Sequence, residues 1–87
     1  MENLSITILK EAVHFLEICQ EHVFNGKIPA NLYFSLSDLK IKFIKNVLEN
    51  NKESILLDTD LNSRLEKVFE NDIFIYNYIG NNKIYMA

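Results

Sequence analysis

The sequence has few of the residues on which several functional classes depend. Its single cysteine, Cys19, cannot form an intramolecular disulfide. Its two glycines do not provide a Gly-rich phosphate loop or a dinucleotide-binding fingerprint. Arg64 is the only arginine, so the bidentate side chain that reads guanine and binds phosphate is almost absent. These scarcities count against nucleotide chemistry and against nucleic-acid binding.

The chain also lacks a long apolar run and an excess of positive charge. No uninterrupted apolar stretch approaches the roughly 20 residues of a membrane span, and Glu2 after Met1 does not resemble a signal peptide. Asp and Glu total 12 against 9 Lys and Arg, so the net charge is −3. An acidic chain disfavours non-specific binding to nucleic acid or anionic lipid and favours a basic protein partner. We therefore expect a cytoplasmic protein without membrane or nucleic-acid partners.

The remaining pattern predicts a single compact α+β domain over residues 1–87, with a core built from the 48% of residues that are hydrophobic. We expect three helices, at about 3–25, 36–50 and 59–71, followed by a C-terminal β-hairpin with strands at about 73–79 and 83–86. Two further segments, 32–34 and 54–57, are candidate short strands.

Helical periodicity and capping residues support the three helices. Apolar residues of the first segment recur on one side, and Gly26 is a typical stop signal after it. Ser35 with Asp38 resembles a capping box at the start of the second helix. Asp58 or Thr59 is suited to cap the third.

The hairpin prediction depends on the last sixteen residues. Ile, Phe and Tyr alternate from residue 73, and Gly80-Asn81-Asn82 tolerates the positive φ of a tight turn. On a strand, Phe74, Tyr76 and Tyr78 share one face, and Ile73, Ile75 and Ile79 lie on the other. Two alternatives remain open: the aromatic row is either an exposed binding surface or part of the core.

Catalytic and metal-binding combinations are weak. His14, Glu17 and Glu21 share a helix side with His22 nearby, but their spacing does not match a metal site. Cys19 falls in an apolar stripe without a cationic neighbour to stabilise a thiolate. The calcium-loop-like start at Asp58 lacks the required Gly and Glu. We expect no enzyme activity, no cofactor and no metal.

Two functions fit the expected element order. The first is a small protein-interaction module, such as an inhibitor, antitoxin or toxin-immunity protein of bacterial or phage type, that blocks a larger and basic partner such as a toxin or nuclease. Its binding residues would comprise four aromatic and three acidic side chains: Phe74, Tyr76, Tyr78, Tyr85, Glu11, Glu17 and Glu21. The alternative is a winged-helix DNA-binding regulator, because three helices precede a hairpin. A homodimer through an edge strand at 83–86 is also compatible with the sequence.

Overall fold

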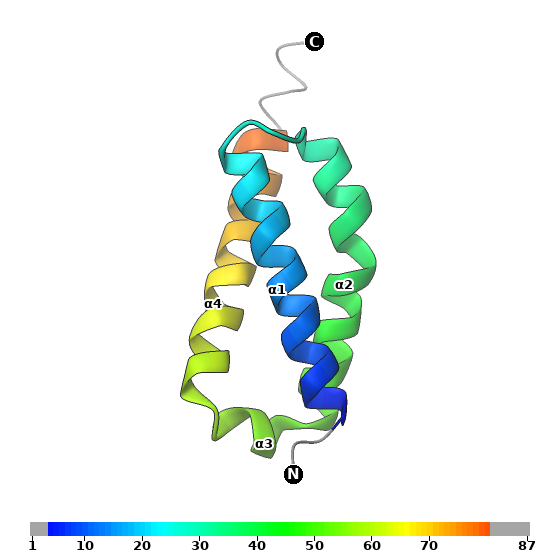
Figure 1. The fold of residues 1–87 in the computed structure, drawn as a ribbon, viewed down its shortest axis with the longest axis vertical. Helices are drawn as coiled ribbons and strands as arrows, with labels where there is room; N and C mark the ends of the chain where they lie inside the picture. Colours follow the sequence, from blue (N-terminus) through cyan, green and yellow to red (C-terminus); the bar gives the residue numbers. More distant parts are fainter. Residues whose placement is uncertain (1–3, 81–87) are drawn as a thin grey trace.

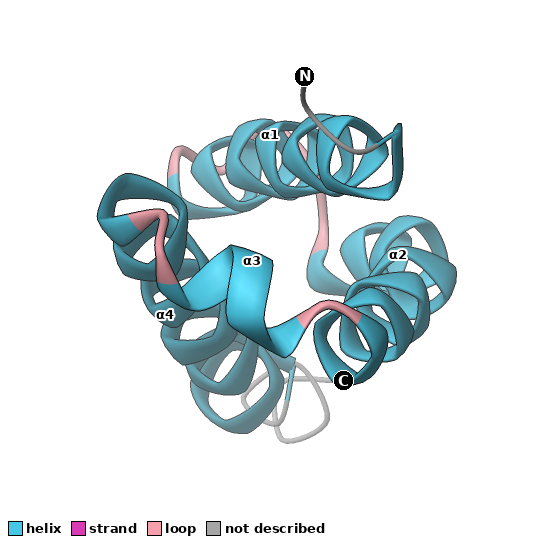
Figure 2. Ribbon diagram, turned by 90° about the horizontal axis from the view of Figure 1, so that it is seen from below, coloured by secondary structure: helices cyan, strands magenta, loops and turns pink. Residues whose placement is uncertain are grey.

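The structure, a computed structural model, describes residues 4–80 and is helical throughout that range apart from short connections. Its elements are α1 (Leu4–Phe24), α2 (Ala30–Asn50), α3 (Lys52–Leu56), α4 (Thr59–Phe74) and a terminal π-helix, η1 (Ile75–Gly80). Figure 1 shows α1, α2 and α4 side by side, with the short α3 at one end and η1 at the other. Viewed along their length, the three long helices surround a common interior (Figure 2). Each helix of residues 4–80 is too short or too polar to cross a membrane.

The predicted α+β class is wrong for these residues. The segments 32–34 and 54–57 are not strands: the first lies inside α2, and most of the second forms the end of α3. The first hairpin strand, 73–79, is the last turn of α4 continued by η1, and the second, 83–86, lies outside the described residues. The winged-helix order of three helices and a hairpin is therefore not the order found in residues 4–80.

Burial explains why the 73–79 segment is helical despite its β-branched and aromatic residues. Ile75 is fully buried, and Ile79 packs against the same cluster. Residues four apart lie on one side of a helix, so helical winding directs both isoleucines inward together. This packing overrides strand propensity, which is weak and dependent on context.

The starts of α2 and α4 test the predicted caps. The second helix begins at Ala30, directly after Pro29, and the predicted cap Ser35 lies within it, donating from Oγ to the carbonyl of Asn31 at 3.2 Å. Ala30 and Tyr33 are both buried, which holds this earlier turn in the helix. The prediction for Asp58 is confirmed, because its carboxylate accepts a 2.9 Å hydrogen bond from the Leu61 N–H.

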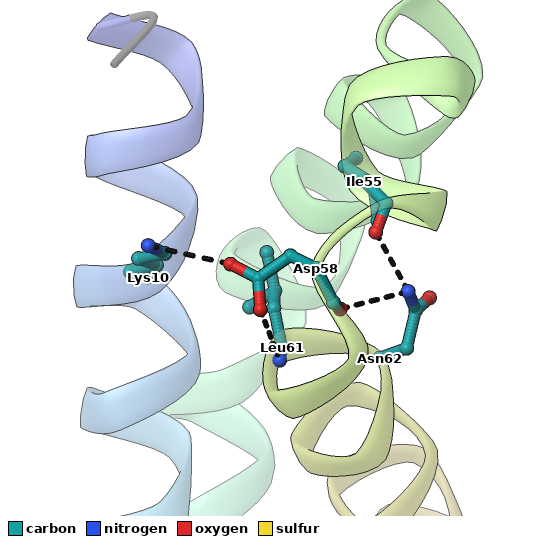
Figure 3. A network of polar contacts seen from close by, with 5 residues as sticks. All are labelled: Lys10, Ile55, Asp58, Leu61 and Asn62. Atoms are coloured by element: carbon teal, nitrogen blue, oxygen red, sulfur yellow. Dashed lines mark hydrogen bonds and ion pairs between the residues drawn. The ribbon is translucent and has the colours of Figure 1, made fainter. Parts of the chain in front are cut away.

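Asp58 also connects three elements at the α3 end (Figure 3). Its second carboxylate oxygen lies 3.5 Å from Nζ of Lys10 on α1. The Leu61 N–H, with the Lys10 ammonium, lowers the pKa of the Asp58 carboxyl. Asn62 donates to the carbonyl oxygens of Ile55 at 2.6 Å and Asp58 at 2.9 Å, and so satisfies the end of α3.

The core consists of two clusters, and α1 and α2 both contribute to each of them. The larger cluster fills the bundle from the α3 end to its middle with side chains of α1, α2, α3 and α4. The smaller cluster joins Cys19 and Val23 of α1 to Ala30 and Tyr33 of α2 and Ile75 of η1. Phe15 packs against both clusters and links them.

Candidate functional site

Five aromatic side chains lie in two groups where α1 ends, α2 begins and α4 passes into η1. We call the two groups together, Phe24, Phe74 and Tyr78 with Phe34 and Tyr76, the aromatic end. Phe74 lies between Phe24 and Tyr78, with ring centres 5.9 and 4.9 Å apart. Phe34 contacts Tyr76 edge to face at 5.3 Å. Phe24, Phe74, Tyr76 and Tyr78 each expose between 45% and 62% of their surface. The site is therefore a set of paired rings with substantial apolar area facing solvent.

The backbone brings these rings together through a tight connection and a continuous helix. Gly26 has a φ of +73°, a conformation that favours glycine, and it reverses the chain between α1 and α2. On the other side, α4 passes directly into η1, and the Ile75 N–H bonds to the carbonyls of Asn71 and Asp72. A π-helical turn is uncommon, and such turns often occur at functional sites.

A buried polar network supports the aromatic end from inside. Gln20 donates from Nε2 to the Tyr33 hydroxyl and to the Val68 carbonyl, both at 2.9 Å. The Tyr33 hydroxyl in turn donates to Oδ1 of Asp72 at 2.7 Å. Burial raises the pKa of Tyr33 well above its ordinary range, so the hydroxyl stays protonated and can donate. These bonds join α1, α2 and α4 and fix the position at which η1 begins.

The predicted aromatic residues lie on a helix, where they do not share one face. Phe74, Tyr76 and Tyr78 are all exposed, but Phe74 and Tyr78 contact each other, whereas Tyr76 contacts Phe34 of α2. Ile73, expected on the opposite face of a strand, is exposed as well. Tyr85 lies outside the described residues.

The three predicted acidic residues do not form one site. Glu17 accepts two hydrogen bonds from Arg64, at 3.0 Å from Nε and 2.7 Å from Nη2, so it joins α1 to α4. The hydrogen bond from Arg64 lowers the pKa of the Glu17 carboxyl. Glu11 lies beside Phe15 and Lys40, on the side of α1 that faces α2. Glu21 alone is near the aromatic end, because it is exposed and precedes Phe24 by one turn.

Further acidic side chains border the aromatic end. Glu70 is exposed one turn before Phe74 on α4, and Asp72 is partly exposed. Among residues 4–80, Lys27 in the connection between α1 and α2 is a nearby cation. The described side chains at this end therefore carry more negative than positive charge, which complements a basic surface.

The other residues with catalytic or metal-binding chemistry have surroundings that indicate a structural role. Cys19 is buried, and this burial raises the pKa of its thiol, which keeps it protonated. His14 lies 3.9 Å from Glu17, which is already bound to Arg64. Within residues 4–80, no group of three His, Cys, Asp or Glu side chains is placed to hold a metal ion.

Sequence reasoning missed Phe24 and Phe34 as members of the aromatic end. The four-residue spacing of Phe74 and Tyr78 could have indicated a helix, because residues four apart lie side by side on a helix. The same two residues also share one face of a strand, so the spacing does not decide between the two structures. Phe24 and Phe34 belong to other elements, and only the folded chain shows that they meet the C-terminal segment.

Comparison of this chain with protein-family models, with curated proteins and with solved structures finds no match. The functional argument therefore depends on the surface itself.

Proposed function

We propose that this protein is an interaction module that binds a larger, basic protein through its aromatic end and blocks that partner's surface, as an inhibitor, antitoxin or toxin-immunity protein does. The exposure of the paired rings at one end of the bundle carries the proposal. Aromatic side chains dominate the energetics of many protein interfaces, and a rigid ring pair loses little entropy on binding.

The surroundings of the rings favour a pre-formed surface. Ile75 and the Gln20–Tyr33–Asp72 network anchor the backbone beneath them, so the rings do not need to be ordered during binding. Glu21 and Glu70 beside them supply negative charge that accelerates encounter with a basic partner.

The experiment is affinity capture from a lysate of the source cells, followed by titration of the captured protein against variants. We expect Tyr76→Ala and Tyr78→Ala each to weaken binding by more than about 1 kcal/mol. Their effect on folding should stay at or below about 1.5 kcal/mol, the usual contribution of one aromatic pair. Leu57→Ala is the matched control, because Leu57 is 86% exposed at the opposite end of the bundle and should leave binding unchanged.

Two results would contradict this proposal. One is unchanged partner affinity in both tyrosine variants. The other is salt-sensitive retardation of random duplex DNA by the wild-type protein without any stoichiometric protein partner, which would indicate nucleic-acid binding instead.

A further inference from the structure

A second set of exposed apolar side chains lies on α1 and α2 and begins at the first turn of α2, beside the aromatic end. We call it the apolar face; its exposed leucines and isoleucines are Leu4, Ile8, Ile18, Leu32, Leu36 and Leu39, of which Ile8 and Leu39 border the groove between the two helices. On α2, Leu32, Leu36 and Leu39 are spaced by four and three residues, as in the seam of a coiled coil. Each helix thus presents one apolar side to its own core and a second one to solvent.

The centre of this face is hollowed and contains charges of both signs. A depression of about 480 Å³ is bordered by Ile8, Phe15 and Leu39, with Glu11 on the α1 side and Lys40 on the α2 side. Nζ of Lys40 lies 5.4 Å from the centre of the Phe15 ring. Apolar side chains therefore surround one anion and one cation that line the same depression on two antiparallel helices.

We propose that a second copy of this chain docks on the apolar face and forms a two-fold symmetric dimer. The symmetry axis runs along the groove, so that α1 of each subunit packs on α2 of the other. Rotation about this axis keeps each residue at its own height along the bundle. It places Glu11 opposite Lys40 of the partner subunit, and Lys40 opposite Glu11 of the partner subunit.

Charge complementarity selects this occupant. A two-fold interface must be complementary to itself, and a face with one anion on one helix and one cation on the other meets that condition. A uniformly basic or acidic helix from another protein would meet a like charge on one side of the groove, which is unfavourable in a desolvated interface. Exposed leucines and isoleucines on two adjacent helices also suit a two-helix surface better than a single helix.

The first test measures the oligomeric state of the full chain by sedimentation velocity. We expect a concentration-dependent dimer for the wild type and at least about a tenfold higher dissociation constant for Leu39→Asp, which puts a charge into the apolar centre. Leu39 is 74% exposed, so this substitution should leave the thermal midpoint nearly unchanged. Leu57→Asp is the matched control outside the face and should dimerise normally. A monomeric wild type, or equal dissociation constants for both variants, overturns the proposal.

The second test uses the charge pair. Glu11→Lys and Lys40→Glu should each weaken self-association, because each homodimer then contains two like-charge contacts. An equimolar mixture of the two variants should dimerise again, because every substituted position then faces an opposite charge in the other subunit. Repulsion within one subunit would persist in the mixture, so absence of this recovery overturns the proposed pairing. Binding of another protein's helix to the face, with no self-association, would also overturn it.

This inference is independent of the aromatic end. Tyr76→Ala and Tyr78→Ala should leave the dimer dissociation constant unchanged, and Leu39→Asp should leave capture of the basic partner intact. The experiments can therefore contradict either proposal without affecting the other.

Discussion

Tyr33 shows how one hydroxyl can join three helices. Its ring is fully buried, and its hydroxyl accepts from Gln20 and donates to Asp72. A buried polar group is tolerated when its hydrogen bonds are satisfied, and it becomes costly when a partner is removed. The network therefore favours a single arrangement of α1, α2 and α4 over others with an equally apolar interior.

The first prediction tests this network with Tyr33→Phe, which keeps the ring and deletes the hydroxyl. We expect the free energy of unfolding to fall by about 1 to 3 kcal/mol, because Gln20 loses a hydrogen-bond partner in a buried setting and Asp72 loses one at a partly buried position. Urea denaturation measures the change. Tyr76→Phe, which deletes an exposed hydroxyl, should change stability by less than about 0.5 kcal/mol. Equal stability of the two variants would show that the network does not stabilise the fold.

The second prediction concerns Glu17 and pH. Its folded-state pKa is lowered, chiefly by the hydrogen bond from Arg64, relative to an ordinary value of 4.5. The unfolded chain therefore binds the proton more readily, so the pair's stabilisation is fully present above about pH 4.5 and is lost as pH falls through the lower folded-state value. Because the Glu17 side chain is 34% exposed, we expect at most about 1 kcal/mol at neutral pH.

Comparison of wild type with Glu17→Gln at pH 7 and pH 3 measures this effect. The stability difference should shrink on acidification, since the carboxyl of the wild type becomes neutral as well. Glu66→Gln, at an exposed position of α4, controls for general loss of charge. A difference that grows toward low pH would contradict the assignment.

At the scale of elements, the sequence predicted the helix that leads up to the junction of α4 and η1 but not its helical continuation beyond residue 71. Two helices were expected at 3–25 and 59–71, close to the observed Leu4–Phe24 and Thr59–Phe74, because periodicity, Gly26 and the Asp58 cap are local signals. The residues beyond 71 carry a local preference for strand, whereas the buried site that receives Ile75 is built by α1 and α2. Such tertiary contacts cannot be predicted from the residues that are adjacent in the sequence.

The same limit applies to the candidate site. Tyr76 and Tyr78 were predicted as binding residues from their alternation on an expected strand, because Tyr is typical of binding surfaces. The structure shows both exposed, but on a helix. The role of Glu17 was missed because Arg64 is 47 residues away in the sequence. An acidic side chain on a polar helix face looks the same whether it faces solvent or a neighbouring helix.

The third prediction distinguishes helix from strand in this segment. On a strand, Ile73 and Ile75 share a face and would have similar burial. In the structure Ile75 is fully buried, whereas Ile73 is 59% exposed. We expect Ile75→Ala to cost about 2 to 5 kcal/mol and Ile73→Ala less than about 0.5 kcal/mol in chemical denaturation. If Ile75→Ala does not fold, Ile75→Val should still cost about 0.5 to 1.5 kcal/mol. Similar losses for the alanine variants at 73 and 75 would favour the strand.

At the scale of the molecule, α1 contributes to both core clusters, and Phe15 contacts both. The α3 end is closed by Asp58 and Asn62, and the aromatic end is held by Gln20, Tyr33 and Ile75. Because α1 and α2 each contribute to both clusters, loss of packing at one end removes support from the other. A bundle of this size should therefore unfold as one unit.

The fourth prediction follows from the placement of the tyrosines. The sequence has no tryptophan, and the three tyrosines among the described residues, Tyr33, Tyr76 and Tyr78, all lie at or beneath the aromatic end. In a Tyr85→Phe variant, tyrosine fluorescence therefore reports on that end, whereas far-ultraviolet circular dichroism reports on all the helices. We expect the two signals to give the same thermal midpoint, because the shared helices α1 and α2 couple the clusters. A fluorescence transition at clearly lower temperature would show that the aromatic end opens independently, and the pre-formed binding surface proposed for it would then be wrong.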